Sequence, residues 1–418
     1  MKISLLKFVI FFGLFGSMPA KASIWQESQN WNPEWEQKYS DWISTSFNED
    51  FFTRGPYKDI ETDCADAVYN ARIIFAFENK LPFAIKDPTG GPQMITNQMS
   101  RFDSIKDPHA RLRKFMGWLE DVVSTKSLAN DTYPVAVHRN YIRAGTVWSR
   151  PRITRDNIFS RIFGGTVKED PGHAELVKNV SETGAIFLIG STVPKAVRNL
   201  NTTSSLVFMP VETSTGFRNW LQPLHYNAPM SEIPGYSLEQ FSSIGKVQAQ
   251  QNSESYAQST QRNLSTWTAD VQNHLAMRPE SKGENIARQL ANLCNLVNTR
   301  VGIILKAEEI RLAHGGACMN AADYDAYSTP SRDKRIMTTL EQLIDVGGGF
   351  GFTKKQRIKD LEPAFAHCPD IQYSPGKFIS LYSYSIKAIS GDISSNPNEN
   401  VETRWGFAPA NSNCPQYE

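Results

Sequence analysis

Residues 63–82 read DCADAVYNARIIFAFENKLP, and this stretch decides the expected fold. Its apolar residues recur at helical spacing, at Val68, Ala71, Ile74 and Phe75. The spacing predicts a helix that begins near Cys64 and runs to about Asn79. Unpaired N–H groups and the positive end of the helix dipole lower the pKa of a thiol in the first turn. Cys64 is therefore a candidate nucleophile, although a cysteine that begins an apolar helix more often serves packing.

A thiol nucleophile needs a base nearby, and the chain contains seven histidines. Three of them lie in or near a region of short predicted strands, namely His138, His173 and His225. His173 follows a glycine and opens a predicted strand over residues 173–180, and a turn and a second strand follow. His138 ends a predicted strand in a less open position. We therefore expect His173 to be the base.

A third residue has to orient the imidazole. If residues 181–184 form a four-residue hairpin loop, Thr192 lies opposite His173, and a loop that differs by one residue puts Ser191 there instead. Either hydroxyl is a candidate for holding the ring. Glu175 lies two residues along the same strand face and is the fallback.

The order of these features resembles that of the NlpC-type cell-wall cysteine peptidases, which belong to the papain-like superfamily. The shared features are Pro56-Tyr57, Asp63-Cys64 at a helix start, Leu81-Pro82 after that helix, and Gly172-His173 opening a hairpin. The resemblance covers residues 55–210 and implies Cys64 as the nucleophile and His173 as the general base. It also implies an α+β, papain-like domain in which the cysteine helix packs on an antiparallel sheet.

The chain departs from that family in two respects. The family usually reads Asp-Cys-Ser-Gly, whereas residues 63–66 read Asp-Cys-Ala-Asp. The interval between Cys64 and His173 is also longer than usual, because a predicted helix around Leu112 and a loop after Pro151 lie between them. We therefore expect a divergent member of the superfamily.

The first residues predict export. Lys2 and Lys7 precede an apolar run, and Ala20-Lys21-Ala22 places small residues at the two positions that a signal peptidase recognises. We expect a signal peptide over residues 1–22 and a secreted or periplasmic mature chain. Ser23 at the predicted cleavage site, in place of a cysteine, argues against a lipoprotein. No later segment has the length and hydropathy of a transmembrane helix.

The five cysteines fit an exported chain. An odd number leaves at least one thiol unpaired or paired with another chain. Four of them lie in the last third of the sequence, at Cys294, Cys318, Cys368 and Cys414. We expect these four to form two disulfides, in one of three possible connectivities, and Cys64 to remain free.

Composition divides the mature chain into three parts. We expect a papain-like hydrolase domain over residues 23–235, a polar linker rich in Gln, Ser and Asn over 236–280, and a mainly helical, disulfide-containing domain over 281–418. A capping box at residues 281–284 opens the first helix of the last part.

The formal net charge is +1 and we find no long basic run, so a nucleic-acid partner is not expected. No cysteine or histidine spacing matches a zinc site, and no motif requires a cofactor. The expected function is a secreted thiol hydrolase that cleaves an amide bond in peptide or a peptidoglycan-like substrate. The alternative is a non-catalytic envelope binding or structural protein that keeps the papain-like fold.

Overall fold

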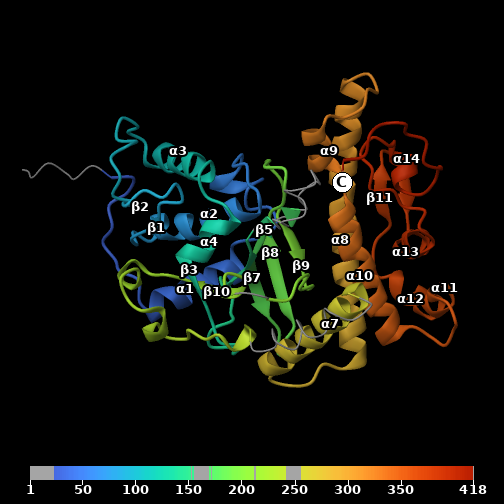
Figure 1. The fold of residues 1–418 in the computed structure, drawn as a ribbon, viewed down its shortest axis with the longest axis horizontal. Helices are drawn as coiled ribbons and strands as arrows, with labels where there is room; N and C mark the ends of the chain where they lie inside the picture. The colour runs from blue at the N-terminus through green and yellow to red at the C-terminus, as the bar shows by residue number, and fades with distance from the viewer. Residues whose placement is uncertain are drawn as a thin grey trace, which may run out of the picture.

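The structure, a computed structural model, describes residues 23–417 apart from 152, 155–168, 171, 211–212 and 242–255. The predicted signal peptide lies outside the described residues. The chain has a mixed α+β fold, in which an antiparallel sheet lies between N-terminal helices and a mainly helical C-terminal region (Figure 1). No helix in the described part is both long and apolar enough to cross a membrane.

The N-terminal helices pack around one apolar helix, α2. They are α1 (Pro33–Thr45), α2 (Cys64–Glu78), α3 (Pro108–Glu120) and α4 (Thr125–Asp131). Helix α2 begins at Cys64 because Asp63 caps it: the Asp63 carboxylate accepts the N–H groups of Ala65 and Asp66, and the Asp66 carboxylate accepts the N–H of Asp63. Nearly all of α2 is buried, so it forms the centre of the N-terminal core.

The main sheet of the described residues has six strands in the order β3-β10-β4-β7-β8-β9, and every neighbouring pair is antiparallel. Its strands are β3 (Thr132–Pro134), β4 (Val147–Arg150), β7 (His173–Val180), β8 (Ile186–Gly190), β9 (Asn201–Thr203) and β10 (Gly216–Trp220). Three two-stranded ladders accompany it: β1 (Ala84–Lys86) with β2 (Met94–Thr96), β5 (Ile153–Thr154) with β6 (Glu169–Asp170), and β11 (Ile371–Ser374) with β12 (Lys377–Ile379).

The two faces of the main sheet pack against different helices. On one face, Ala174 and Leu176 of β7 join the core around α2. On the other face, Trp148 of β4 stacks on Trp267 of α7 (Tyr256–Leu275). Side chains alternate between the faces of a strand, so His173 and Glu175 lie on the face opposite Ala174.

The β7–β8 hairpin has the expected register at its open end. The pairs Leu176–Ile189 and Val177–Leu188 follow the expected register, and the ladder between β7 and β8 begins at Leu176, so the position of Thr192 opposite His173 stays a prediction. The turn is tighter than expected, since the Ser181 N–H donates to the Ala185 carbonyl, and a bulge in the second half of β7 restores the register.

Two strand predictions were wrong. The run over residues 205–210, rich in valine and phenylalanine, predicts a strand, but none forms there, and the strand next to β8 is β9, at residues 201–203. Strand β10 was missed, although it lies between β3 and β4 inside the sheet. Its sequence includes Arg218, whose buried guanidinium donates to Thr132 and to the carbonyl of Ala129. A buried arginine with such partners breaks the apolar pattern that predicts an inner strand.

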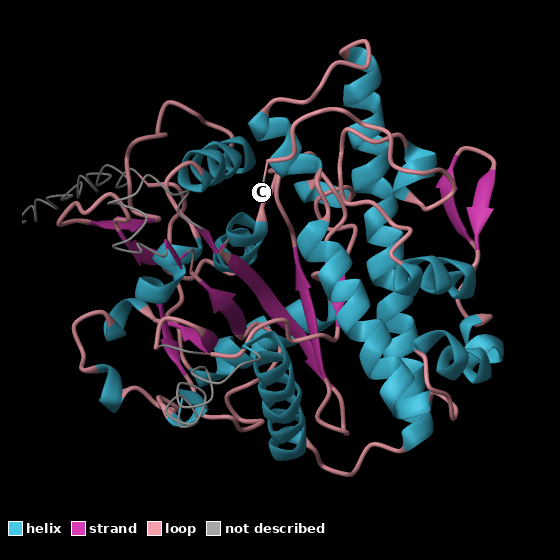
Figure 2. Cartoon of the chain, turned by 45° about the vertical axis from the view of Figure 1, so that its right-hand side comes forward, coloured by secondary structure: helices cyan, strands magenta, loops and turns pink. Residues whose placement is uncertain are grey.

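The C-terminal region is mainly helical. It contains α8 (Lys282–Ala313), α9 (Ala321–Tyr327), α10 (Pro330–Gly347), α11 (Lys354–Arg357), α12 (Glu362–Phe365), α13 (Leu381–Ser390) and α14 (Val401–Arg404). The predicted capping box opens α8, since Ser281 and Glu284 exchange hydrogen bonds. Helices α8 and α10 run side by side and share an apolar core (Figure 2).

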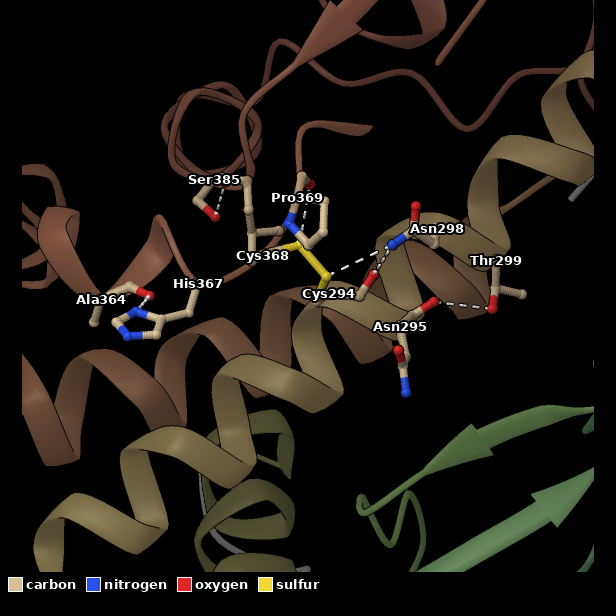
Figure 3. Close-up of a disulfide and its surroundings, with 10 residues drawn as sticks. Cys294, Asn295, Asn298, Thr299, Ala364, His367, Cys368, Pro369 and Ser385 are labelled. Atoms are coloured by element: carbon tan, nitrogen blue, oxygen red, sulfur yellow. Dashed lines mark hydrogen bonds between the residues drawn. A yellow bond between two sulfur atoms is a disulfide. The ribbon is translucent and has the colours of Figure 1, made fainter. Parts of the chain in front are cut away.

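Two disulfides connect this region, as expected from the cysteine count. Cys294 of α8 bonds to Cys368 (Figure 3), and Cys318 bonds to Cys414. Cys64 is the free cysteine. Of the three possible connectivities, the structure therefore shows the pairing of the first cysteine with the third and of the second with the fourth.

Part of the expected polar linker, residues 236–280, is helical and packed. Its residues 256–275 form α7, whose Trp267, Val271 and Leu275 join the apolar cluster on the sheet. Residues 242–255 lie outside the described part. The C-terminal helices also contact the sheet edge, because Asn292 of α8 accepts a hydrogen bond from Thr203 of β9. The C-terminal region is therefore packed on the sheet.

Candidate functional site

Cys64 contacts the start of strand β7. The thiol is 7 % exposed, and the backbone N–H of Ala174 donates to its sulfur. Burial raises the pKa of the thiol to about 12, the negative charge of Asp63 adds to the increase, and the Ala174 N–H opposes it. The isolated thiol is therefore protonated at neutral pH, and it becomes a nucleophile only if a base removes its proton.

The backbone around Cys64 offers one donor to a substrate. The N–H groups of Ala65 and Asp66 are already taken by the Asp63 carboxylate. The N–H of Cys64 itself makes no hydrogen bond to a described residue. This N–H is available to the negative oxygen of a tetrahedral intermediate.

His173 is held by a carboxylate and faced by an arginine. Its Nε2 atom lies 2.8 Å from Oε2 of Glu175 and 3.3 Å from Nη2 of Arg335, which belongs to α10. The side chain is 20 % exposed. Nδ1 makes no hydrogen bond within the part of the chain that the structure describes. The arrangement leaves that nitrogen available to a thiol or to a substrate.

Glu175 is ionised in the interior of the protein. It is 2 % exposed, and its second oxygen, Oε1, lies 3.6 Å from Nη1 of Arg335. Burial alone would raise the pKa of this carboxyl, but the positive charges and hydrogen bonds of His173 and Arg335 lower it to about 2. A fixed carboxylate on Nε2 orients the ring and favours the tautomer with its proton on that nitrogen.

The two hydroxyls expected to orient His173 have other partners. Ser191 is buried and donates to the carbonyl of Thr62, and Thr192 accepts a hydrogen bond from Nη2 of Arg332 at 2.8 Å. The fallback, Glu175, is the residue that contacts the ring. The period of two along a strand was the signal that identified it.

Residues 191–198, here termed the strap, lie over the start of α2. A backbone bridge joins Thr62 to Ala196, and Lys195 pairs with Glu120 at 2.6 Å. Arg332 holds the strap from the other side by donating to the carbonyl of Val193. These contacts bring strap, α2 and α10 together around Cys64 and His173.

The predicted pair is adjacent in space, but its side chains are not joined. The link between the two residues is indirect. The N–H group that donates to the Cys64 sulfur belongs to Ala174, the residue that follows His173. The ring extends from the opposite face of β7, toward Glu175. No hydrogen bond joins Cys64 to His173 among the described residues.

Nothing in the sequence indicated that two arginines of α10 would lie at this site. Arg335 lies 162 positions from His173, and Arg332 lies 140 positions from Thr192. Both belong to α10, whose sequence carries no motif that points to the sheet. Only the packing of the C-terminal region on the sheet places them at this site.

A separate cavity of about 1070 Å³ lies in the C-terminal region, lined by residues that include Tyr324, Ser395, Phe407 and Tyr417. It shares no lining residue with the site at Cys64. Within the described residues, no group of three or more His, Cys, Asp or Glu side chains is arranged to hold a metal ion.

Comparison of the chain with protein-family models, with curated proteins and with solved structures finds no match. The likeness to NlpC-type peptidases therefore rests on Cys64, His173 and the elements that carry them. Function has to be argued from the chemistry of this site.

Proposed function

We propose that the chain is a secreted thiol hydrolase with a papain-like N-terminal domain, and that it cleaves an amide bond in cell-wall peptide. Cys64 is the nucleophile and His173 the general base. The observation that supports this proposal is the contact of the Cys64 sulfur with the N–H of Ala174. The start of α2 and the start of β7, which are distant in the sequence, lie side by side at this contact, and this supports a pairing of Cys64 with His173.

The reaction begins when the imidazole takes the thiol proton. A ring nitrogen of His173 accepts this proton. The thiolate attacks the amide carbonyl, and the N–H of Cys64 stabilises the negative oxygen of the tetrahedral intermediate. The imidazolium then protonates the leaving amine, and a water molecule activated by His173 hydrolyses the acyl-enzyme.

Because the ring extends from the face of β7 opposite the sulfur, the reactive arrangement requires the start of β7 to shift and the ring to turn toward the sulfur. The pKa of about 12 for the thiol belongs to the arrangement in which the two are not bonded. An imidazolium beside the sulfur favours the thiolate and lowers that pKa. The proposal therefore treats the described arrangement as a resting state.

The cellular location belongs to the same proposal. Disulfides persist in oxidising compartments, and two of them join the C-terminal helices. They support an extracytoplasmic location, together with the predicted signal peptide.

One observation favours a second function, that of a non-catalytic envelope protein that keeps the fold. Cys64 is buried and its thiol has a raised pKa, as expected of a cysteine that serves packing. In that case His173, Glu175 and Arg335 join the C-terminal helices to the sheet and perform no chemistry.

Digestion of purified muropeptides, followed by mass spectrometry, tests the proposal. The wild-type protein is expected to cleave an amide bond, and Cys64→Ala and His173→Gln are each expected to lower the rate at least about 1000-fold. His274→Gln is the matched control, because this histidine is exposed and contacts only its own helix. Equal cleavage by Cys64→Ala would exclude Cys64 as the nucleophile, and no cleavage by the wild type would favour the second function.

A further inference from the structure

Three arginines gather beside His173. Arg332 and Arg335 are three residues apart on α10 and therefore share a helix face. Arg198 comes from the strap and is close enough to Arg332 for their charges to interact. Arg335 contacts His173, and Arg332 contacts Thr192 of the strap.

Two of the three guanidinium groups have no carboxylate partner. Arg332 donates to the Thr192 hydroxyl and to backbone carbonyls, and Arg198 donates to the carbonyl of Pro194. Within the described ranges, neither forms an ion pair with an acidic side chain. The Nε atom of Arg198 is buried and has no hydrogen-bond partner. A carbonyl oxygen accepts a hydrogen bond from a guanidinium N–H group, but it carries no net charge and does not neutralise the arginine.

The nearby carboxylates are already engaged. Glu175 pairs with His173 and Arg335. Asp333, the neighbour of Arg332, pairs with Arg300 at 2.6 Å. Burial lowers the pKa of Arg332 to about 10, and repulsion by Arg198 and Arg335 contributes to the decrease. The cluster therefore has an excess of positive charge, which an anion would reduce.

We infer that Arg198, Arg332 and Arg335 form a subsite for a carboxylate that the substrate carries close to the amide bond being cleaved. The inference rests on the proposed function, because it is the contact of Arg335 with His173 that places the subsite next to the reacting atoms. Guanidinium groups bind carboxylates through paired N–H donors, and a partly buried site strengthens each of these bonds. The substrate class is accordingly an acidic peptide.

A binding experiment in the Cys64→Ala protein tests the subsite without catalysis. The probes are N-acetyl-alanyl-alanine and its neutral C-terminal amide, titrated at constant ionic strength and followed by NMR chemical shifts. The acid is expected to bind and the amide to bind at least about tenfold more weakly, because a charge-assisted hydrogen bond is lost. Arg198→Gln is expected to abolish this preference.

Arg54→Gln is the matched control, since that arginine is 81 % exposed and pairs only with Asp50. It is expected to leave the preference unchanged, and thermal unfolding verifies that each variant is folded. Equal binding of acid and amide, or a preference that persists in Arg198→Gln, would overturn the subsite. Tighter binding of inorganic phosphate with the same dependence on Arg198 would reassign the site to phosphate groups. If the protein does not cleave muropeptides but still prefers the acid to the amide, the proposed function is overturned and the carboxylate-binding subsite is not.

Discussion

Removal of the Cys294–Cys368 disulfide is expected to lower the free energy of unfolding of the C-terminal region by about 4 kcal/mol. The bond closes a loop with a sequence separation of 74 residues, and closing a long loop reduces the entropy of the unfolded chain. It also joins α8 to the segment after α12, both of which contribute to one apolar core. Chemical denaturation of Cys294→Ala/Cys368→Ala, followed by circular dichroism, measures the loss.

Cys64→Ala is the control for this experiment, because it removes a cysteine and leaves both disulfides intact. Reduction of the wild-type protein should destabilise it at least as much as the double substitution, since it also opens Cys318–Cys414. Unchanged stability of the double variant would mean that packing alone holds α8 against that segment.

Glu175→Gln is expected to destabilise the protein by roughly 3 kcal/mol at pH 7. The carboxyl has a folded pKa of about 2 against an ordinary value of 4.5, and each unit corresponds to about 1.4 kcal/mol. Glutamine also leaves Arg335 and His173 without their buried counter-charge.

The pH dependence has a defined sign. A carboxyl whose folded pKa is lowered stabilises the protein above its unfolded pKa, and this contribution is lost as the pH falls from about 4.5 toward 2. The difference between the wild type and Glu175→Gln should therefore be full at pH 7 and should largely disappear near pH 2. Urea unfolding at pH 7, 5 and 3 measures this trend.

Glu182→Gln provides the comparison for Glu175. Glu182 lies in the β7–β8 turn and pairs with Arg278, but both side chains are exposed. Its replacement should change stability by less than about 1 kcal/mol. A loss at Glu175 that is small or independent of pH would contradict a buried ionised carboxylate beside His173.

Local signals in the sequence identified the elements that carry the site. Apolar spacing after Cys64 located the start of α2, and the glycine before His173 and the turn after Val180 located the ends of β7. The capping box at Ser281 located the start of α8. Each of these signals lies within a few residues of the feature that it predicts, so these helix and strand ends could be predicted from the sequence alone.

Contacts between distant segments could not be predicted in this way. Thr192 was placed opposite His173, but its hydroxyl is held by Arg332 from a helix in another part of the chain. Glu175 holds the ring because it lies on the same strand face and Arg335 balances its charge. The order of β10 within the sheet likewise depends on the polar partners of a buried arginine, Arg218.

The central claim is that Cys64 and His173 act as a pair, and the pH dependence of Cys64 alkylation tests it without a known substrate. The other four cysteines are in disulfides, so iodoacetamide reports on Cys64 alone. We expect the wild-type rate to show an inflection far below the raised pKa of the isolated thiol, from thiolate that forms beside the imidazolium. We expect His173→Gln to lose this inflection and to retain only the rise toward high pH of a thiol with a pKa of about 12. Identical profiles for both proteins, each rising only at high pH, would contradict the account.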